Sequence, residues 1–213
     1  MIKAILFDFD GTLVDTNPLI IRSFKETFKK LLPDRQFSQE EILDCIGPTL
    51  EQTGKKYFPG NPKAFAEIYR EYNLRYHDEM IEVYPGVKEM LAQVKQMNLT
   101  LVIVTSKRRD VLLRGLQQTD LSDYFDWIVA ADDVENPKPH QEPIERVLEH
   151  YGFEPEECLM VGDNSHDIEC ARSAGVKSIA VGWALRGVEY LNAFNPDFII
   201  NKADDLIELL TMG

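Results

Sequence analysis

Short apolar runs alternate along most of the chain with stretches of helical spacing, and this alternation limits the possible folds more than any other feature. The apolar runs are strand-sized and nearly continuous, at residues 2–7, 99–104, 127–130, 159–161, 178–181 and 198–200. Runs of this kind are typical of parallel strands covered on both faces. Helical spacing recurs at residues 86–97, 109–118, 141–151, 166–174 and 203–211. The pattern therefore predicts an α/β fold built on an open parallel sheet.

One interval breaks this alternation. Between Asp15 and about Glu82 no convincing strand pattern occurs, whereas stretches such as residues 19–28 have helical spacing. Because the interval follows the first strand directly, it should cover the sheet edge at which that strand ends. We therefore predict a Rossmann-like parallel sheet core, residues 1–14 and 83–213, and an inserted all-helical cap, residues 15–82, placed as a lid.

The first predicted strand ends in two carboxylates, Asp8 and Asp10, and the chain then turns at Gly11. An unpaired carboxylate is costly to bury, so two of them at the end of a buried strand indicate a bound cation. Side chains alternate along a strand, so Asp8 and Asp10 can lie on one face while Phe9 packs on the other. Oxygen ligands of this kind are typical of Mg²⁺, which is the cofactor that we predict.

Polar groups also follow three other predicted strands. Residues 105–107 follow the second, Lys138 lies in the loop after the third, and Asp163 and Asp167 follow the fourth. The carboxyl ends of parallel strands meet at one sheet edge, so these groups should share a crevice. Singly, each has an ordinary structural interpretation, such as a helix cap at Thr105. Together they predict a site.

Charge limits the classes of partner. The chain has 36 acidic and 23 basic residues, a net charge of −13, which argues against a nucleic-acid or anionic-membrane surface. No apolar run is long enough for a membrane span, and the N-terminal run meets Asp8 too early for a signal peptide. We therefore expect a cytoplasmic protein, a monomer or weak dimer, acting on a small molecule. An anionic substrate would need local positive charge.

The ordered set DFDGTLVDT, Thr105, Lys138-Pro139 and VGDNSHD resembles the four motifs of the haloacid dehalogenase-like phosphohydrolases. The inserted interval resembles the helical cap of their phosphoglycolate phosphatase-like subgroup. The resemblance implies a magnesium-dependent phosphohydrolase in which Asp8 attacks phosphorus to form an aspartyl phosphate and Asp10 protonates the leaving oxygen.

The same resemblance implies roles for the other groups. Thr105 and Lys138 would hold the phosphoryl oxygens. Mg²⁺ would be held by Asp8, the Asp10 carbonyl group and Asp163. Asp167 would bind the metal through water or orient Lys138.

Several loops resemble the inorganic pyrophosphatases of this family more closely than its phosphoglycolate phosphatases. They are residues 46–48, 105–110, 132–134 and 182–187. This implies hydrolysis of inorganic pyrophosphate, with Lys107 and Arg186 near the second phosphate. The remaining predicted substrate-binding residues are Gly11, Thr12, Gly47, Pro48 and Ser106.

Three alternatives stay open. The first is a phosphatase acting on phosphoglycolate or another small phosphomonoester. A sugar-phosphate mutase is less favoured, because residues 46–50 contain no basic side chain to grip a second phosphate. A non-catalytic binding module is also less favoured, because the chain keeps Asp8, Asp10, Lys138 and Asp163.

Overall fold

The computed structural model describes residues 1–212 and contains one six-stranded parallel sheet. The strand order is β5-β4-β1-β6-β7-β8. The strands are β1 (Ala4–Phe7), β4 (Thr100–Val104), β5 (Trp127–Val129), β6 (Cys158–Gly162), β7 (Lys177–Val181) and β8 (Phe198–Ile200). Each overlaps one of the predicted apolar runs, so the predicted α/β fold is confirmed.

Helices cover both faces of the sheet. They are α5 (Val87–Gln96), α6 (Arg109–Gln118), α7 (Glu142–Tyr151), α8 (Ser165–Ser173), α9 (Gly187–Asn192) and α10 (Asp205–Met212), with the short 3₁₀ helices η2 (Ser122–Tyr124), η3 (Ala131–Asp133) and η4 (Pro155–Glu157). Alternation along β1 separates the two packing layers: Ile5 and Phe7 pack in the layer with α5, α6 and α10, whereas Ala4 and Leu6 pack with α7 and α8. Both faces are therefore buried, as the continuous apolar runs predicted.

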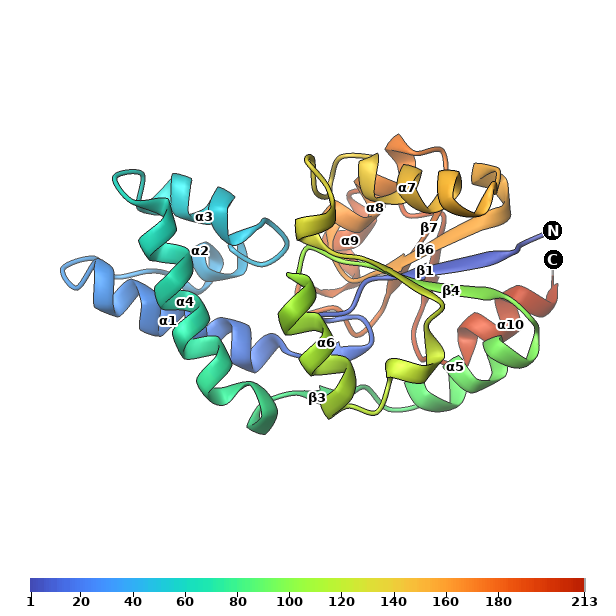
Figure 1. Ribbon diagram of the computed structural model, residues 1–213, viewed down its shortest axis with the longest axis horizontal. Helices are drawn as coiled ribbons and strands as arrows, with labels where there is room; N and C mark the ends of the chain where they lie inside the picture. Colours follow the sequence, from blue (N-terminus) through green and yellow to red (C-terminus); the bar gives the residue numbers. More distant parts are fainter. Residues whose placement is uncertain (213) are drawn as a thin grey trace.

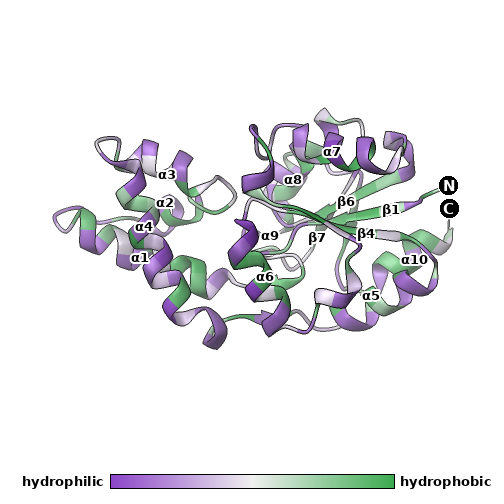
Figure 2. Ribbon diagram, viewed as in Figure 1, coloured by the Kyte–Doolittle hydropathy of each residue, from purple (hydrophilic) through white to green (hydrophobic). Residues whose placement is uncertain are grey.

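The interval after β1 forms a separate group of helices beside the sheet domain (Figure 1). Its elements are α1 (Asn17–Leu31), α2 (Gln39–Leu43), α3 (Leu50–Tyr57), α4 (Pro62–Tyr76) and the 3₁₀ helix η1 (His77–Glu79). This cap has its own aromatic core, in which Phe24, Phe28 and Phe65 pack together. The hydrophobic residues of the sheet domain gather on its strands, whereas those of the cap lie on one side of each long helix (Figure 2).

The two ends of the helical interval pair with each other, which the sequence pattern did not predict. Strands β2 (Val14–Asp15) and β3 (Glu82–Val83) form a two-stranded antiparallel ladder in which Val14 lies opposite Val83. Two residues are too few to show a period of two. The exact limits of the cap, residues 15 and 82, stay a prediction.

Within residues 1–212, no helix combines the length and the apolar composition that crossing a membrane requires. The cytoplasmic location stays a prediction.

Candidate active site

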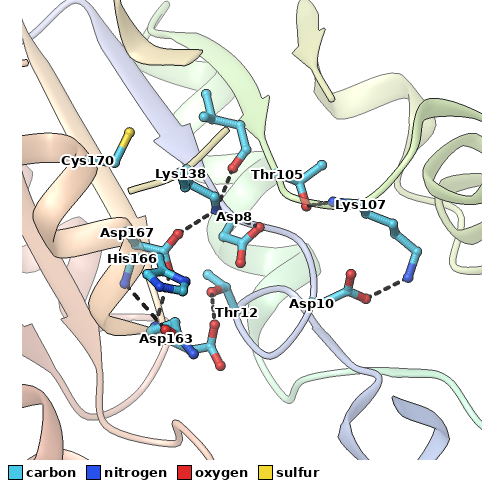
Figure 3. A network of polar contacts seen from close by, with 12 residues as sticks. Asp8, Asp10, Thr12, Thr105, Lys107, Lys138, Asp163, His166, Asp167 and Cys170 are labelled. Atoms are coloured by element: carbon cyan, nitrogen blue, oxygen red, sulfur yellow. Dashed lines mark hydrogen bonds and ion pairs between the residues drawn. The ribbon is translucent and has the colours of Figure 1, made fainter. Parts of the chain in front are cut away.

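Three carboxylates meet where the strands of the sheet end. Asp8 follows β1, Asp163 follows β6, and Asp167 lies in the first turn of α8. One oxygen from each lies within 4.8 Å of the others, and all three residues are buried. Figure 3 shows these side chains gathered around the same point.

Lys138 supplies the positive charge of this cluster. Its Nζ lies 3.1 Å from Oδ1 of Asp8 and 2.5 Å from Oδ1 of Asp167, and it donates a hydrogen bond to the carbonyl oxygen of Val104 at 3.0 Å. Burial favours the neutral amine, but the carboxylates of Asp167 and Asp8 outweigh it and raise the pKa of Lys138. The ammonium group is therefore fixed between Asp8 and Asp167.

The cluster fits a divalent cation. Three ionised carboxylates and one ammonium group leave an excess of two negative charges in a buried space. Burial, followed by the neighbouring carboxylates, raises the pKa of Asp163 well above its usual range, and burial raises the pKa of Asp8 to about 7. Oδ1 of Asp8 is buried and, apart from its ion pair with Lys138, has no polar partner among the described residues. A hard cation held by oxygen ligands would offset all three features.

Gly11 allows the turn after Asp8 to approach Asp163. Its φ is +79°, and a Cβ atom at this position would lie 2.2 Å from Oδ2 of Asp163. The hydroxyl group of Thr12 donates to Oδ1 of Asp163 at 3.4 Å. Gly11 and Thr12, which were predicted to bind substrate, are thus placed against a carboxylate of the cluster.

Asp10 points away from the cluster, toward Lys107 (Figure 3). Lys107 follows β4, and its Nζ lies 2.7 Å from Oδ1 of Asp10. Thr105, at the end of β4, accepts a hydrogen bond from the backbone N–H of Lys107 at 3.2 Å. The cation predicted for the second phosphate is therefore paired with the predicted acid.

A cavity of about 600 Å³ lies between the sheet domain and the cap. The core contributes Asp8, Asp10, Thr105, Ser106, Lys107, Arg108, Lys138 and Asp163 among others, and the cap contributes Gly47, Pro48, Lys55, Tyr69, Arg70 and Asn73 among others. Most of the predicted site residues thus line one space. The role of the cap as a lid stays a prediction.

The cap touches the core at one edge of this cavity. The carbonyl oxygen of Ile46 accepts a hydrogen bond from the side chain of Asn164 at 3.2 Å. Gly47 has a φ of +110°, and a Cβ atom here would lie 2.7 Å from Nδ1 of His166. His166 also lines the cavity, although it was not among the predicted site residues.

Arg186 is not among the described residues that line this cavity. Its Nη2 lies 2.7 Å from Oε1 of Glu40 and 2.6 Å from Oδ1 of Asp44, and its guanidinium group stacks on the ring of Tyr190. Glu40 and Asp44 belong to the cap, so Arg186 links the two parts of the molecule. The spacing of the sequence contains no signal for this contact, because Glu40 is 146 residues away.

Comparison with known proteins gives one consistent family. The model of the haloacid dehalogenase-like hydrolase family matches residues 5–181. "Pyrophosphatase PpaX" of Halalkalibacterium halodurans is 41% identical over 209 residues, covering 98% of this chain and 97% of that protein. "Pyrophosphatase PpaX" of Bacillus cereus is 43% identical over 210 residues, covering 99% and 97%.

Solved structures of the same kind share the fold. A haloacid dehalogenase-like family protein from Streptococcus pneumoniae superposes with a TM-score of 0.85 at 26% identity, covering 98% of each chain. A structure titled "predicted phosphatase" from Clostridium acetobutylicum has a TM-score of 0.88 at 26% identity, covering 100% of each chain. The likeness extends over the cap as well as the sheet domain.

Proposed function

The chain belongs to the haloacid dehalogenase-like hydrolases, and from this membership we propose that it hydrolyses inorganic pyrophosphate to phosphate with Mg²⁺ as its cofactor. The observation that carries the proposal is the buried cluster of Asp8, Asp163, Asp167 and Lys138 at the base of the cavity. Nearly full-length relatives named as pyrophosphatases support the choice of substrate.

Asp8 is the nucleophile in this proposal. Apart from its ion pair with Lys138, its Oδ1 has no polar partner among the described residues, and the backbone N–H of Asp8 donates to the carbonyl oxygen of Val161 at 2.9 Å. The carboxylate attacks phosphorus, the bond to the bridging oxygen breaks, and inorganic phosphate leaves. Water then hydrolyses the aspartyl phosphate and restores Asp8.

Lys138 and Thr105 act on the phosphoryl group. Lys138 is held beside Asp8 by Asp167 and by the carbonyl oxygen of Val104, so its charge is oriented before substrate arrives. The Thr105 hydroxyl group lies at the end of the adjacent strand and lines the cavity. Positioned donors of this kind stabilise the charge on the phosphoryl oxygens in the transition state.

Asp10 transfers the protons. It donates a proton to the leaving oxygen and later takes one from the attacking water. In the structure its carboxylate is bound to Lys107, so it must exchange this contact for the substrate. Lys107 thereby holds Asp10 near the cavity before the reaction.

Asp8, the Asp10 carbonyl group and Asp163 would hold Mg²⁺, with Asp167 acting through water or by orienting Lys138. When bound, the ion neutralises charge on the phosphate and allows two anions, the nucleophile and the substrate, to approach each other. The chain's own excess of negative charge in the cluster supports this assignment.

A phosphatase acting on phosphomonoesters is the second candidate. The cavity has a volume of about 600 Å³ and is open between two domains, so a leaving group larger than phosphate can enter it. The cap residues that line the cavity, rather than the cluster around Asp8, would choose between these substrates.

The two candidates differ in one measurement. Purified protein with Mg²⁺ is assayed against pyrophosphate, phosphoglycolate, sugar phosphates and p-nitrophenyl phosphate at several concentrations. We expect the largest kcat/KM for pyrophosphate. A larger value for phosphoglycolate would replace the first proposal by the second. Excess chelator is expected to abolish hydrolysis, and activity that persists there would contradict the metal.

We also propose that the protein acts in the cytoplasm as a monomer or weak dimer, without nucleic-acid partners. The net charge of −13 supports the exclusion of nucleic acid. Light scattering after gel filtration over a range of concentrations tests the oligomeric state, and a stable larger assembly would contradict it.

A further inference from the structure

A pyrophosphatase must hold a second phosphate, and the two cations that sequence analysis assigned to it are already paired. Lys107 is bound to Asp10, and Arg186 is bound to Glu40 and Asp44. An ion pair to a protein carboxylate reduces the charge that a substrate meets. The leaving phosphate therefore needs another cation at the cavity.

Of the five lysine and arginine residues that line the cavity within residues 1–212, four form ion pairs with carboxylates. The four are Lys55 with Glu51, Lys107 with Asp10, Arg108 with Asp110, and Lys138 with Asp8 and Asp167. The fifth is Arg70. It forms no ion pair with any residue that the structure describes, and its Nε is buried without a hydrogen-bond partner.

Arg70 lies on the side of α4 that faces the cavity. Tyr69 and Asn73 of the same helix are buried and line the same space, and the Asn73 amide group donates to the Tyr69 hydroxyl group at 3.5 Å. Together with burial, the negative charge of Asp10 raises the pKa of Tyr69. This turn of α4 therefore lies within electrostatic reach of the residue that protonates the leaving oxygen.

Arg108 of the core and Arg70 of the cap line the same cavity. Burial first, and then the positive charge of Arg108, lower the pKa of Arg70, which the carboxylates of Asp110 and Glu67 offset only in part. Of these two guanidinium groups, Arg108 pairs with Asp110, whereas Arg70 forms no ion pair with any residue that the structure describes. A partly buried guanidinium group without an anionic partner is unfavourable until an anion binds to it.

We propose that Arg70 binds the leaving phosphate of pyrophosphate. The inference rests on the proposed function and adds a specificity residue from the cap to the reaction site of the core. Arg70 presents a planar fork of N–H donors, which suits a phosphate, and its Nε is free to donate. A phosphomonoester with an uncharged leaving group gains little from Arg70, so this residue favours pyrophosphate over such esters.

Arg70→Ala tests the inference, with hydrolysis of pyrophosphate and of p-nitrophenyl phosphate measured on the same preparations. We expect kcat/KM for pyrophosphate to fall about tenfold to a hundredfold, the range for a hydrogen bond between charged groups. For p-nitrophenyl phosphate we expect a change below about twofold. Arg70→Lys keeps the charge and is expected to recover part of the loss.

A second readout measures binding without turnover. Methylenediphosphonate and inorganic phosphate are each used as inhibitors of p-nitrophenyl phosphate hydrolysis. In Arg70→Ala the inhibition constant of the diphosphonate is expected to rise about tenfold or more, and that of phosphate to change by less than about twofold. Thermal unfolding of each variant confirms that it is folded.

Arg75→Ala is the matched control. Arg75 lies on the same helix, is about half exposed and pairs with Glu71 at 3.1 Å, away from the cavity. Arg75→Ala is expected to leave kcat/KM unchanged for both substrates. If kcat/KM of Arg70→Ala falls equally on both substrates, or does not fall on pyrophosphate, this inference is wrong but the proposed function still stands. A wild-type protein that hydrolyses p-nitrophenyl phosphate but not pyrophosphate would overturn the proposed function, and this inference with it.

Discussion

The two walls of the cavity use charge differently. On the core side Lys138 and Lys107 are fixed by carboxylates of the proposed active site, at 3.1 Å or less. On the cap side Arg70 faces the space without a partner among the described residues. Groups that perform chemistry need a fixed position before substrate arrives, whereas a group that recognises substrate gains most when its only good partner is that substrate.

The two walls also differ in what holds them. The core wall stands on strands whose residues are fully buried, such as Phe7 and Val104. The cap wall belongs to a helical group whose links to the core include the β2–β3 ladder, the Asn164 contact and the ion pairs of Arg186. We therefore expect variants of the core wall to affect catalysis and stability strongly, and variants of the cap to affect mainly the choice of substrate.

The largest expected effect is that of Asp8→Asn. The amide keeps the shape of the side chain but removes its charge and nucleophilicity. We expect kcat to fall by about 10³-fold or more on every substrate, unlike the selective loss expected for Arg70→Ala. Steady-state kinetics with pyrophosphate and p-nitrophenyl phosphate measure the loss in each of these two variants. Substantial activity in a folded Asp8→Asn protein would contradict the view that the core wall performs the chemistry and the cap wall selects the substrate.

The next effect concerns the stability of the core wall. Lys138→Met leaves the carboxylates of Asp8 and Asp167 buried without their cation, and removing one partner of a buried ion pair costs about 3–5 kcal/mol. Urea unfolding at pH 8 in chelator measures this change in the free energy of unfolding. Lys30→Met is the control, because Lys30 pairs with Glu71 on the cap surface and its loss is expected to cost less than about 1 kcal/mol. Similar costs for both variants would contradict the comparison.

The pH dependence of stability sharpens the same contrast. In the metal-free protein burial raises the pKa of Asp8 from 3.8 to about 7. A carboxyl group with a raised pKa favours the folded state while protonated, so its contribution is complete below about pH 4 and is lost as pH rises through 7. The loss is expected to be about 2–4 kcal/mol.

Thermal or urea unfolding between pH 4.5 and 8 in chelator measures this loss, as the difference between wild type and Asp8→Asn. Mg²⁺ is expected to raise the unfolding temperature of wild type more at pH 8 than at pH 5, because the ion binds ionised carboxylates. Arg70→Gln should leave the pH dependence unchanged. A wild-type protein whose stability in chelator tracks that of Asp8→Asn at every pH would contradict the assignment.

Much of the fold could be predicted from the sequence because strands buried on both faces leave continuous apolar runs. Residues 198–200, for example, were predicted as a strand and form β8. The β2–β3 ladder and α9 were not predicted, because elements of two and six residues show too little periodicity. Their positions depend on contacts between distant parts of the chain.

The candidate site likewise has a part that could be predicted from the sequence and a part that could not. Asp8, Lys138, Asp163 and Asp167 could be predicted to meet, because strand ends of a parallel sheet fix their positions. Their chemical roles stay predictions. The partners of Arg186 and the exposure of Arg70 to the cavity depend on how the cap rests on the core, and no local pattern records that arrangement.

Arg186 offers the smallest and most discriminating test. Sequence analysis placed it at the second phosphate, whereas its ion pairs with Glu40 and Asp44 indicate a link between core and cap. Because the side chains of Glu40 and Asp44 are 74% and 43% exposed, we expect Arg186→Ala to lower the free energy of unfolding by only about 0.5–1 kcal/mol. A double-mutant cycle with Asp44→Asn, followed by urea unfolding, is expected to give a coupling energy of similar size.

Kinetics of the same variants then separate the two interpretations. A link between domains affects every substrate that needs the cap in place, so Arg186→Ala and Asp44→Asn should change kcat/KM for pyrophosphate and p-nitrophenyl phosphate by the same small factor. A phosphate-binding role predicts a selective loss for pyrophosphate in Arg186→Ala and none in Asp44→Asn. That second pattern would move Arg186 to the substrate, and it would show that the cap is not alone in recognising the leaving phosphate.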